Sequence, residues 1–424
     1  MNSIRTHLAY GLPALPLAAV LLPFFIFMPN LVAGRIVVVG TAWLVLPLFC
    51  VVLSLIVLLA TGMGSDSLRT GFGRRKPWFL VGAPLLTLGV WEMFTLTAEI
   101  GWLGFVLRCL ILVVGWMMTM VPLIAHGAEL TLNYRERTLL AGVRGAFALL
   151  GLLAALTLIW IYGQTEAGLV ACAWLVMLSM PVAMLVYLVL TPTEIGLSYR
   201  LRPEQSFLHV LSGHVAALRL LVAVTVNSIA IGIVFALFVW PVQTVPTAMT
   251  LGLALFTLPI WLRLSMRFSR HRVWACAIGV CALGLALLLI VHLSMGQPPG
   301  TALLGALGAL IGIGIGPDLV MPSTLMADCI DRDTWRSGRQ RTGLWFVMYA
   351  TFVGGGFMVA FLVDAFATGG FGSYAIVEPV ILVALGLKLI AMVLMWKHPL
   401  GFVEQEETRR DIEARWLAMR AAHR

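Results

Sequence analysis

The chain has 424 residues, of which 61% are hydrophobic and only 11% are charged, and its formal net charge is +9. About a quarter of the residues of a soluble domain are charged, so this composition excludes a soluble globular protein. The excess of cations does not indicate a nucleic-acid partner, because the cations lie in short segments between long apolar runs. No nucleic acid is therefore expected to bind.

The sequence lacks the signatures of a metal site or an active site. No two of its six cysteines have metal-ligand spacing, and most lie inside apolar runs, where they are expected to be small core residues. There is no phosphate-binding glycine loop and no pairing of a nucleophile with a base. No cofactor, metal ion or enzymatic activity is expected.

About twelve apolar runs are long enough to cross a bilayer, for which about 20 residues suffice. The first six lie at 8–30, 36–61, 78–98, 102–128, 138–161 and 167–190, and the second six at 215–240, 246–268, 272–295, 300–326, 342–367 and 374–396. Backbone groups must pair within each run in lipid, so an all-α integral membrane protein with twelve transmembrane helices is predicted. The expected divisions are a six-helix bundle at 1–190, a central cytoplasmic loop at 191–212, a second bundle at 213–396 and a helical tail at 397–424.

Cations alternate from loop to loop and predict the orientation of the chain. One set of loops is basic, and the alternate loops carry few cations. The positive-inside rule places the basic set, and with it both termini, in the cytoplasm. The expected location is the inner membrane of a bacterium.

Two basic loops stand at equivalent places in the two predicted bundles, at 64–78 and 267–272. Matching loops after the second and eighth runs indicate a parallel repeat about an axis along the membrane normal. This pattern predicts a major-facilitator fold of two six-helix halves, with the solute bound near the midplane between them.

Three short motifs carry a resemblance to a known family. They are Gly64-Ser65-Asp66 with Gly73 to Trp78, Glu129 to Thr138 followed by Arg144, and Ala327 to Asp331 followed by Gly338 and Arg339. In this order along the chain they resemble the motifs of the glycoside–pentoside–hexuronide:cation symporters, which include the melibiose permeases. The resemblance implies secondary transport by alternating access, with a sugar or glycoside as the solute and a cation as the coupling ion.

The chain departs from that family where the coupling cation would bind. The positions of the cation-site carboxylates fall on Ser54, Leu58 and Asn133, and the first-span acidic residue falls near Ala18. A lysine that is usual in the eleventh span falls near Val353. These departures predict that sodium coupling is lost, and that the solute is either a sugar or a less polar, amphipathic or lipid-like molecule.

Charged residues next to the basic loops are candidates for a cytoplasmic gate. Opposite charges at equivalent places in the two halves can close that side as ion pairs, whereas the simpler interpretation is an orientation signal or a solvated loop. The candidates are Asp66, Arg74, Arg75, Glu129, Arg135, Arg137, Arg144, Asp328, Asp331 and Arg339.

Several polar residues inside the runs are candidates for a substrate or proton path. Glu92 and Arg108 lie at similar depth in consecutive runs and are expected to interact, as a structural staple or as part of a path. The other candidates are Asn133, Asn227, Asp318 and Trp116. Lys388 is expected to snorkel or to bond inward, and His126 to be a satisfied interfacial histidine.

Two functions remain open from the sequence. The first is a secondary transporter whose partners are a small-molecule or amphipathic solute, membrane lipid and a proton as the coupling ion. The second is a membrane protein on a carrier scaffold that binds or assembles without transporting.

Overall fold

The computed structural model of the chain describes most of its residues. They are residues 3–24, 36–37, 56–68, 70–95, 100–131, 133–163, 165–194, 213–239, 244–295, 299–337, 340–367, 377–399, 401, 404–412 and 414.

Helices make up the N-terminal part of the described chain. In order they are α1 (Ile4–Gly11), α2 (Ala14–Ala19), a helix at 56–67, α5 (Lys76–Phe94), α6 (Trp102–Glu129), α7 (Tyr134–Tyr162) and α8 (Glu166–Leu190). Two short strands, β1 (Ile36–Val37) and β2 (Ile100–Gly101), pair in parallel, with Ile36 opposite Ile100. Pro13 separates α1 from α2, because proline interrupts the backbone hydrogen bonding of a helix.

The C-terminal part is helical as well. It contains α10 (Val215–Val239), α11 (Thr244–Arg267), α12 (Arg270–Met295), α13 (Thr301–Ile315), the 3₁₀ helix η1 (Gly316–Leu319), α14 (Met321–Ser337), α15 (Thr342–Ala367), α16 (Val377–Trp396) and a helix at 404–412.

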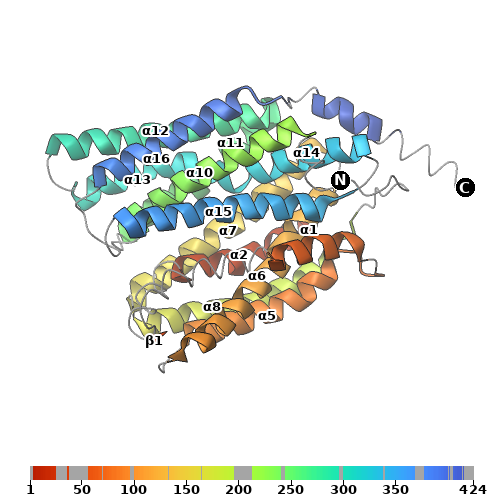
Figure 1. Cartoon of the computed structure of the whole chain (residues 1–424), viewed down its shortest axis with the longest axis horizontal. Helices are drawn as coiled ribbons and strands as arrows, with labels where there is room; N and C mark the ends of the chain where they lie inside the picture. The colour runs from red at the N-terminus through yellow and green to blue at the C-terminus, as the bar shows by residue number, and fades with distance from the viewer. Residues whose placement is uncertain are drawn as a thin grey trace, which may run out of the picture.

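The helices are grouped into two bundles of roughly parallel elements (Figure 1). Helices α1 to α8 lie in one bundle and α10 to α16 lie in the other, and the two meet along their length. Both chain termini lie at the same end of the molecule, on the right of Figure 1. This end, which carries Arg75, Arg137 and Arg270, is called the basic end below.

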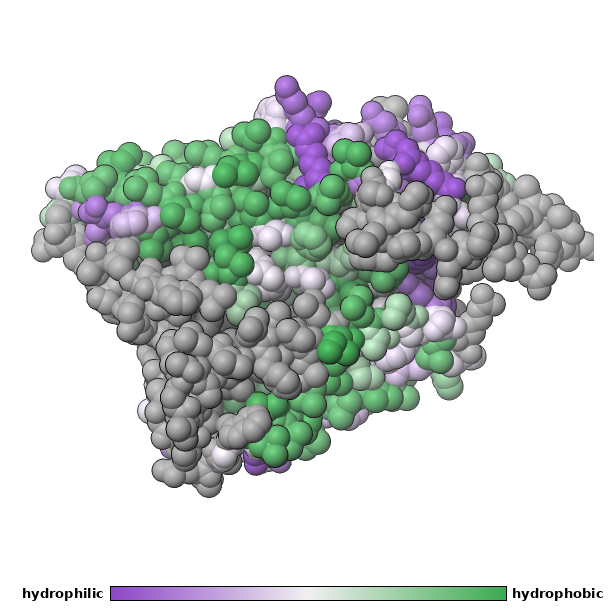
Figure 2. Space-filling view, viewed as in Figure 1, coloured by the Kyte–Doolittle hydropathy of each residue, from purple (hydrophilic) through white to green (hydrophobic). Residues whose placement is uncertain are grey.

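Eleven helices of the described chain are long and apolar enough to cross a membrane. Hydrophobic side chains cover the length of the bundle of α10 to α16, the upper one in this view, and most of the hydrophilic side chains gather toward the basic end (Figure 2). The prediction of an all-helical integral membrane fold is confirmed. The second predicted run, 36–61, lies mostly outside the described residues.

The tenth predicted run ends later than the sequence indicated. The spanning segment Thr301–Ser337 contains α13, η1 and α14, so that Asp328 and Asp331 lie on a helix and not in a loop. The break falls at Gly316 and Pro317, where the helix tightens to a 3₁₀ turn and then continues. A polar helical segment therefore extends the span at the basic end.

Candidate functional site at the interface of the two bundles

A buried arginine joins two carboxylates at the basic end of the N-terminal bundle. The Arg75 side chain has no exposed area, and its Nη2 donates to Asp66 Oδ1 at 2.7 Å and to Glu129 Oε1 at 2.6 Å. Its Nε donates to Glu129 Oε2 at 3.0 Å. Burial alone would lower the pKa of Arg75, but Glu129 and Asp66 outweigh it and raise that pKa above its ordinary value. Arg75 is thus held charged between both acids.

The same carboxylates contact the C-terminal bundle. Asp66 accepts hydrogen bonds from the backbone N–H groups of Gly343 at 2.8 Å and Leu344 at 3.0 Å, in the first turn of α15. These N–H groups have no partner within the helix, and the helix dipole favours a negative charge beside them. The Thr342 side chain also hydrogen bonds Glu129. We call Asp66, Arg75 and Glu129 the Asp66 cluster.

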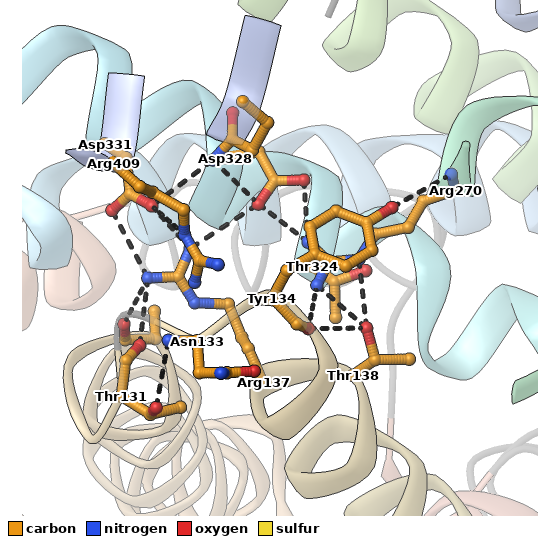
Figure 3. Close-up of polar contacts among 12 residues, drawn as sticks. Thr131, Asn133, Tyr134, Arg137, Thr138, Arg270, Thr324, Asp328, Asp331 and Arg409 are labelled. Atoms are coloured by element: carbon orange, nitrogen blue, oxygen red, sulfur yellow. Dashed lines mark hydrogen bonds and ion pairs between the residues drawn. The ribbon is translucent and has the colours of Figure 1, made fainter. Parts of the chain in front are cut away.

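A second cluster joins the bundles between α7, α12 and α14 (Figure 3). Arg137 Nη1, from the N-terminal bundle, lies 2.6 Å from Asp331 Oδ2. Arg270 Nη1 donates to both oxygens of Asp328 at 2.7 Å, and its Nη2 donates to the carbonyl oxygen of Tyr134 at 2.6 Å. We call Arg137, Arg270, Asp328 and Asp331 the Asp328 cluster.

The C-terminal tail packs against this cluster. Gln405 Nε2 donates to Asp328 Oδ1 at 3.1 Å, and Arg409 Nε lies 4.0 Å from Asp331 Oδ2. Both tail side chains are buried, as is Ile412. Burial lowers the pKa of Arg409 to about 10, and Arg137 acts in the same direction. The sequence predicted a helical tail, and in the structure one face of its helix is part of the interface between the bundles.

Arg144 crosses between the bundles deeper in the membrane. Its Nη2 donates to Ser323 Oγ at 2.7 Å and to the carbonyl oxygen of Leu319 at 3.4 Å, and its Nη1 donates to the Tyr10 hydroxyl at 3.4 Å. These side chains line a small pocket together with Phe346. Arg137 of the Asp328 cluster lines the same pocket, so Arg144 lies at the interface next to that cluster.

Arg74 also lies at this interface. Its Nη2 donates to Gln340 Oε1 at 2.9 Å and lies 3.3 Å from Glu129, and its backbone N–H donates to Glu194. The Arg135 side chain, in contrast, is exposed and points away from the clusters. Arg339 and Ser54 lie outside the described residues.

Asn133 occupies a different place from the one expected. It is the N-cap of α7, is exposed, and its Oδ1 accepts from the backbone N–H groups of Arg135 at 3.0 Å and Glu136 at 3.1 Å. The structure thus gives Asn133 a role as a helix cap, and its place in a substrate path or a cation site stays a prediction. Asparagine favours this position because its side-chain oxygen satisfies N–H groups that the helix leaves free.

An Asn133→Ala variant tests this structural role. We expect it to lower the free energy of unfolding by about 1 kcal/mol, because one helix cap is lost. Asn133→Asp, which keeps the capping oxygen, should have the stability of the wild type. A melting curve of each variant in detergent is the measurement. A wild-type melting temperature for Asn133→Ala would show that the cap contributes nothing.

The predicted contact between Glu92 and Arg108 is present. Arg108 Nε donates to Glu92 Oε2 at 3.2 Å, and the two side chains remain 28% and 40% exposed, Arg108 being the more buried. The pair lies on the outside of the N-terminal bundle. Trp116 is half-buried, and its Nε1 donates to the carbonyl oxygen of Leu17 at 3.3 Å.

Asn227 and Asp318 meet inside the C-terminal bundle. Asn227 Nδ2 donates to Asp318 Oδ1 at 3.0 Å, and Trp274 Nε1 donates to the same oxygen at 2.5 Å. Lys388 Nζ donates to Asn227 Oδ1 at 2.8 Å and to Asp318 Oδ2 at 3.3 Å. Lys388 therefore bonds inward and does not snorkel.

The described positions expected to have lost a charged residue of the family, a carboxylate at Leu58 and Ala18 and a lysine at Val353, are apolar and packed. Leu58 is 2% exposed and belongs to the main apolar core, and Ala18 is 6% exposed. Val353 is partly buried against the same core. At these described positions no side-chain oxygen is available to a cation.

Sequence reasoning missed Arg270, Gln405 and Arg409 as members of the interface. One of the matching basic loops contains Arg270, but the cations of these loops were used only to predict the orientation of the chain. No pattern in the tail distinguishes Gln405 and Arg409 from their exposed neighbours, because only the contact with the Asp328 cluster decides which face of the tail helix is buried.

Two helical bundles that meet at buried polar clusters within spanning helices define an integral membrane protein of the major-facilitator type. The chain belongs to the family described as MFS/sugar transport protein, which matches residues 6–376 and is the family of melibiose-permease-like transporters. The resemblance of the three motifs is confirmed by this match. No curated protein sequence matches the chain.

Solved transporter structures share the fold. The proton:xylose symporter XylE bound to 6-bromo-6-deoxy-D-glucose aligns with a TM-score of 0.68 at 15% identity, over 97% of this chain and 98% of that one. The transporter FucP in the outward conformation aligns with a TM-score of 0.64 at 14% identity, over 92% and 98%. A bacterial homologue of the iron transporter ferroportin in an outward-facing state aligns with a TM-score of 0.66 at 14% identity, over 93% and 99%. At these identities the likeness shows the fold alone.

Proposed function

We propose that the chain is a secondary transporter that moves an organic solute by alternating access, and that the Asp66 and Asp328 clusters are its cytoplasmic gate. The observation that carries the proposal is the contact of Asp66, in one bundle, with the first-turn N–H groups of α15 in the other. This contact is polar and directional, so it can be broken and remade without exposing apolar core. When the bundles separate, water can replace the Asp66 carboxylate and the N–H groups of α15 as hydrogen-bond partners, and this lowers the free-energy cost of separation.

The solute that the chain favours is less polar than a sugar. Leu58 and Ala18 are packed apolar residues at places where the family resemblance implies carboxylates. Because a sugar needs several hydrogen-bond partners and an amphiphile needs apolar contact area, these residues support an amphipathic or lipid-like solute. Coupling to a proton fits the loss of oxygen ligands for sodium.

A reversible crosslink across the gate tests the proposal. A Cβ on Gly62 would lie 3.2 Å from the Cβ of Val347 and 3.0 Å from the carbonyl oxygen of Gly343, both in the other bundle. The two helices must therefore move apart by a few tenths of an ångström to reach the roughly 3.5–4.5 Å between the Cβ atoms of a disulfide. Val347→Cys also removes the Cγ2 methyl group of Val347, which would collide with a Cβ on residue 62. Gly62→Cys/Val347→Cys protein in liposomes should therefore be locked when oxidised and free when reduced.

The readouts are uptake of lysophosphatidylcholine, followed by back-extraction with albumin, and uptake of a methyl glycoside. We expect amphiphile uptake by the reduced protein, at least tenfold less uptake by the oxidised protein, and no glycoside uptake. The Val347→Cys single variant controls for oxidation itself. Sodium-stimulated glycoside uptake would overturn the choice of solute, and equal fluxes before and after oxidation would favour a non-transporting binding or assembly protein.

A further inference from the structure

A polar cluster whose charged groups are all paired is buried inside the C-terminal bundle, apart from the proposed gate. Its members come from four elements: Asn227 from α10, Trp274 from α12, Asp318 from η1 and Lys388 from α16. The side chain of Lys388 has no exposed area and that of Asp318 is 5% exposed. Each charged group has an opposite charge and a neutral hydrogen-bond partner, so the cluster is neutral and satisfied.

Asp318 and Glu92 are the two carboxylates inside spans that the sequence analysis named as candidates for a substrate or proton path, and the structure separates them. Glu92 lies near the end of α5 with its side chain 40% exposed, beside Arg108. Asp318, in contrast, contacts residues in the middle of α10 and of α16. Burying an ion pair in a spanning bundle is expensive, and intramembrane ionisable groups are usually functional.

Asp318 also lies at the helix break next to the interface of the bundles. Gly316 and Pro317 precede it in η1, which interrupts the spanning segment between α13 and α14. A 3₁₀ stretch within a helix often marks a hinge. The carbonyl oxygen of the next residue, Leu319, accepts the hydrogen bond from Arg144 of the other bundle. A change at Asp318 can therefore reach the contact between the bundles through one residue.

We propose that Asp318 is the binding site of the coupling proton and that Lys388 is the counter-ion that holds it ionised while the basic end is closed. This inference rests on the proposed transport function. The proton is transferred from a hydronium ion, whose O–H bond breaks as an O–H bond forms on the Asp318 carboxylate. One water molecule is released, and Lys388 remains an ammonium ion.

Proton binding removes the charge that pairs with Lys388. The titratable groups of the described chain that interact with Asp318 are Lys388 on α16, Cys281 on α12 and Tyr349 on α15. Tyr349 interacts in turn with Arg144 on α7. Without its partner the buried ammonium is destabilised, so the bundle must rearrange around η1. The rearrangement loosens the contacts of Arg144 with Leu319 and Ser323, and acidification thereby favours opening of the basic end.

Distances between spin labels on the two bundles test the inference directly. Ile4 (79% exposed) and Phe268 (58% exposed) lie at the basic end in different bundles, and cysteines there would carry the labels. Cys276, which is exposed, is changed to serine, and the other described cysteines are buried and stay in place. The distance distribution is measured in lipid nanodiscs across a pH series, with the proton as the only ligand.

We expect acidification to shift the wild-type population from the short to the long distance. Asp318→Asn should give the long distance at every pH, because it leaves the Lys388 ammonium unpaired, and Lys388→Met should abolish the acid-induced shift, because proton binding then leaves no unpaired ammonium. Glu92→Gln is the matched control and should keep the wild-type midpoint. If Asp318→Asn does not fold, the charge-neutral Asp318→Asn/Lys388→Met double variant should fold and show no pH response.

Two results would overturn the inference in distinguishable ways. A wild-type pH response in Asp318→Asn or in the double variant would show that another group binds the proton, and would leave the transport function standing. A single short distance in the wild type at every pH, together with equal solute uptake by the oxidised and the reduced Gly62→Cys/Val347→Cys protein, would overturn both the inference and alternating access.

Discussion

Replacement of Arg75 by methionine is expected to open the basic end and to destabilise the protein by about 3–5 kcal/mol, the range for removal of one partner of a buried ion pair. Arg75 is the fully buried cation between Asp66 and Glu129. Without it, Glu129 stays buried with a negative charge, and Asp66 loses the group that orients it toward α15. Methionine fills a similar volume, so the loss of charge and hydrogen bonds dominates over a cavity.

Two measurements check this expectation. The melting temperature of Arg75→Met should fall, and the distance between labels at positions 4 and 268 should shift to the long population. Arg135→Met is the matched control, because the Arg135 side chain is exposed near the same interface and should contribute about 0–1 kcal/mol at most. An Arg75→Met protein that keeps the short distance and the wild-type melting temperature would show that the Asp66 cluster does not hold the bundles together.

Reversal of the charge at position 137 is the second change from which we expect a large effect. Arg137→Glu would place a third carboxylate beside Asp328 and Asp331, at the position where an arginine now lies 2.6 Å from Asp331. Like charges at short range in a buried site repel strongly, and the arginine's hydrogen bonds to the carbonyl oxygens of Ala128 and Thr131 are lost as well. The closed basic end should lose about 3–5 kcal/mol relative to the open one.

The reciprocal change provides the internal test. Arg137→Glu/Asp331→Arg restores an attractive pair across the same interface and should recover part of the short-distance population. Recovery is incomplete because the new arginine faces Gln405 and Arg409 of the tail. Arg410→Glu, at a side chain that is 76% exposed, should leave the distance unchanged. If the double variant is no better than the sum of the two single variants, Arg137 and Asp331 do not act as a pair.

Local patterns in the sequence were sufficient to predict much of the organisation of the chain. The apolar runs predicted spanning helices, and the three motifs predicted the family, which covers residues 6–376. The pairing of Glu92 with Arg108 also followed from the sequence, because two residues equidistant from one turn must reach similar depth in an antiparallel hairpin. These inferences need only the length, periodicity and spacing of residues close together in the chain.

The partners of the charged residues across the bundles required the structure. Asp66 contacts Gly343, which is 277 positions away, and Arg137 contacts Asp331, which is 194 positions away. Asn133 was expected at a degenerate cation site and is seen as a helix cap, and of the two alternatives for Lys388, snorkelling and bonding inward, the structure shows the second. The sequence itself thus determined a membrane-spanning helical carrier with a basic end, because lipid solvation acts on each segment independently. The tertiary structure decided which charges meet, because two bundles can place the same charged residues together in many ways and only their packing selects one.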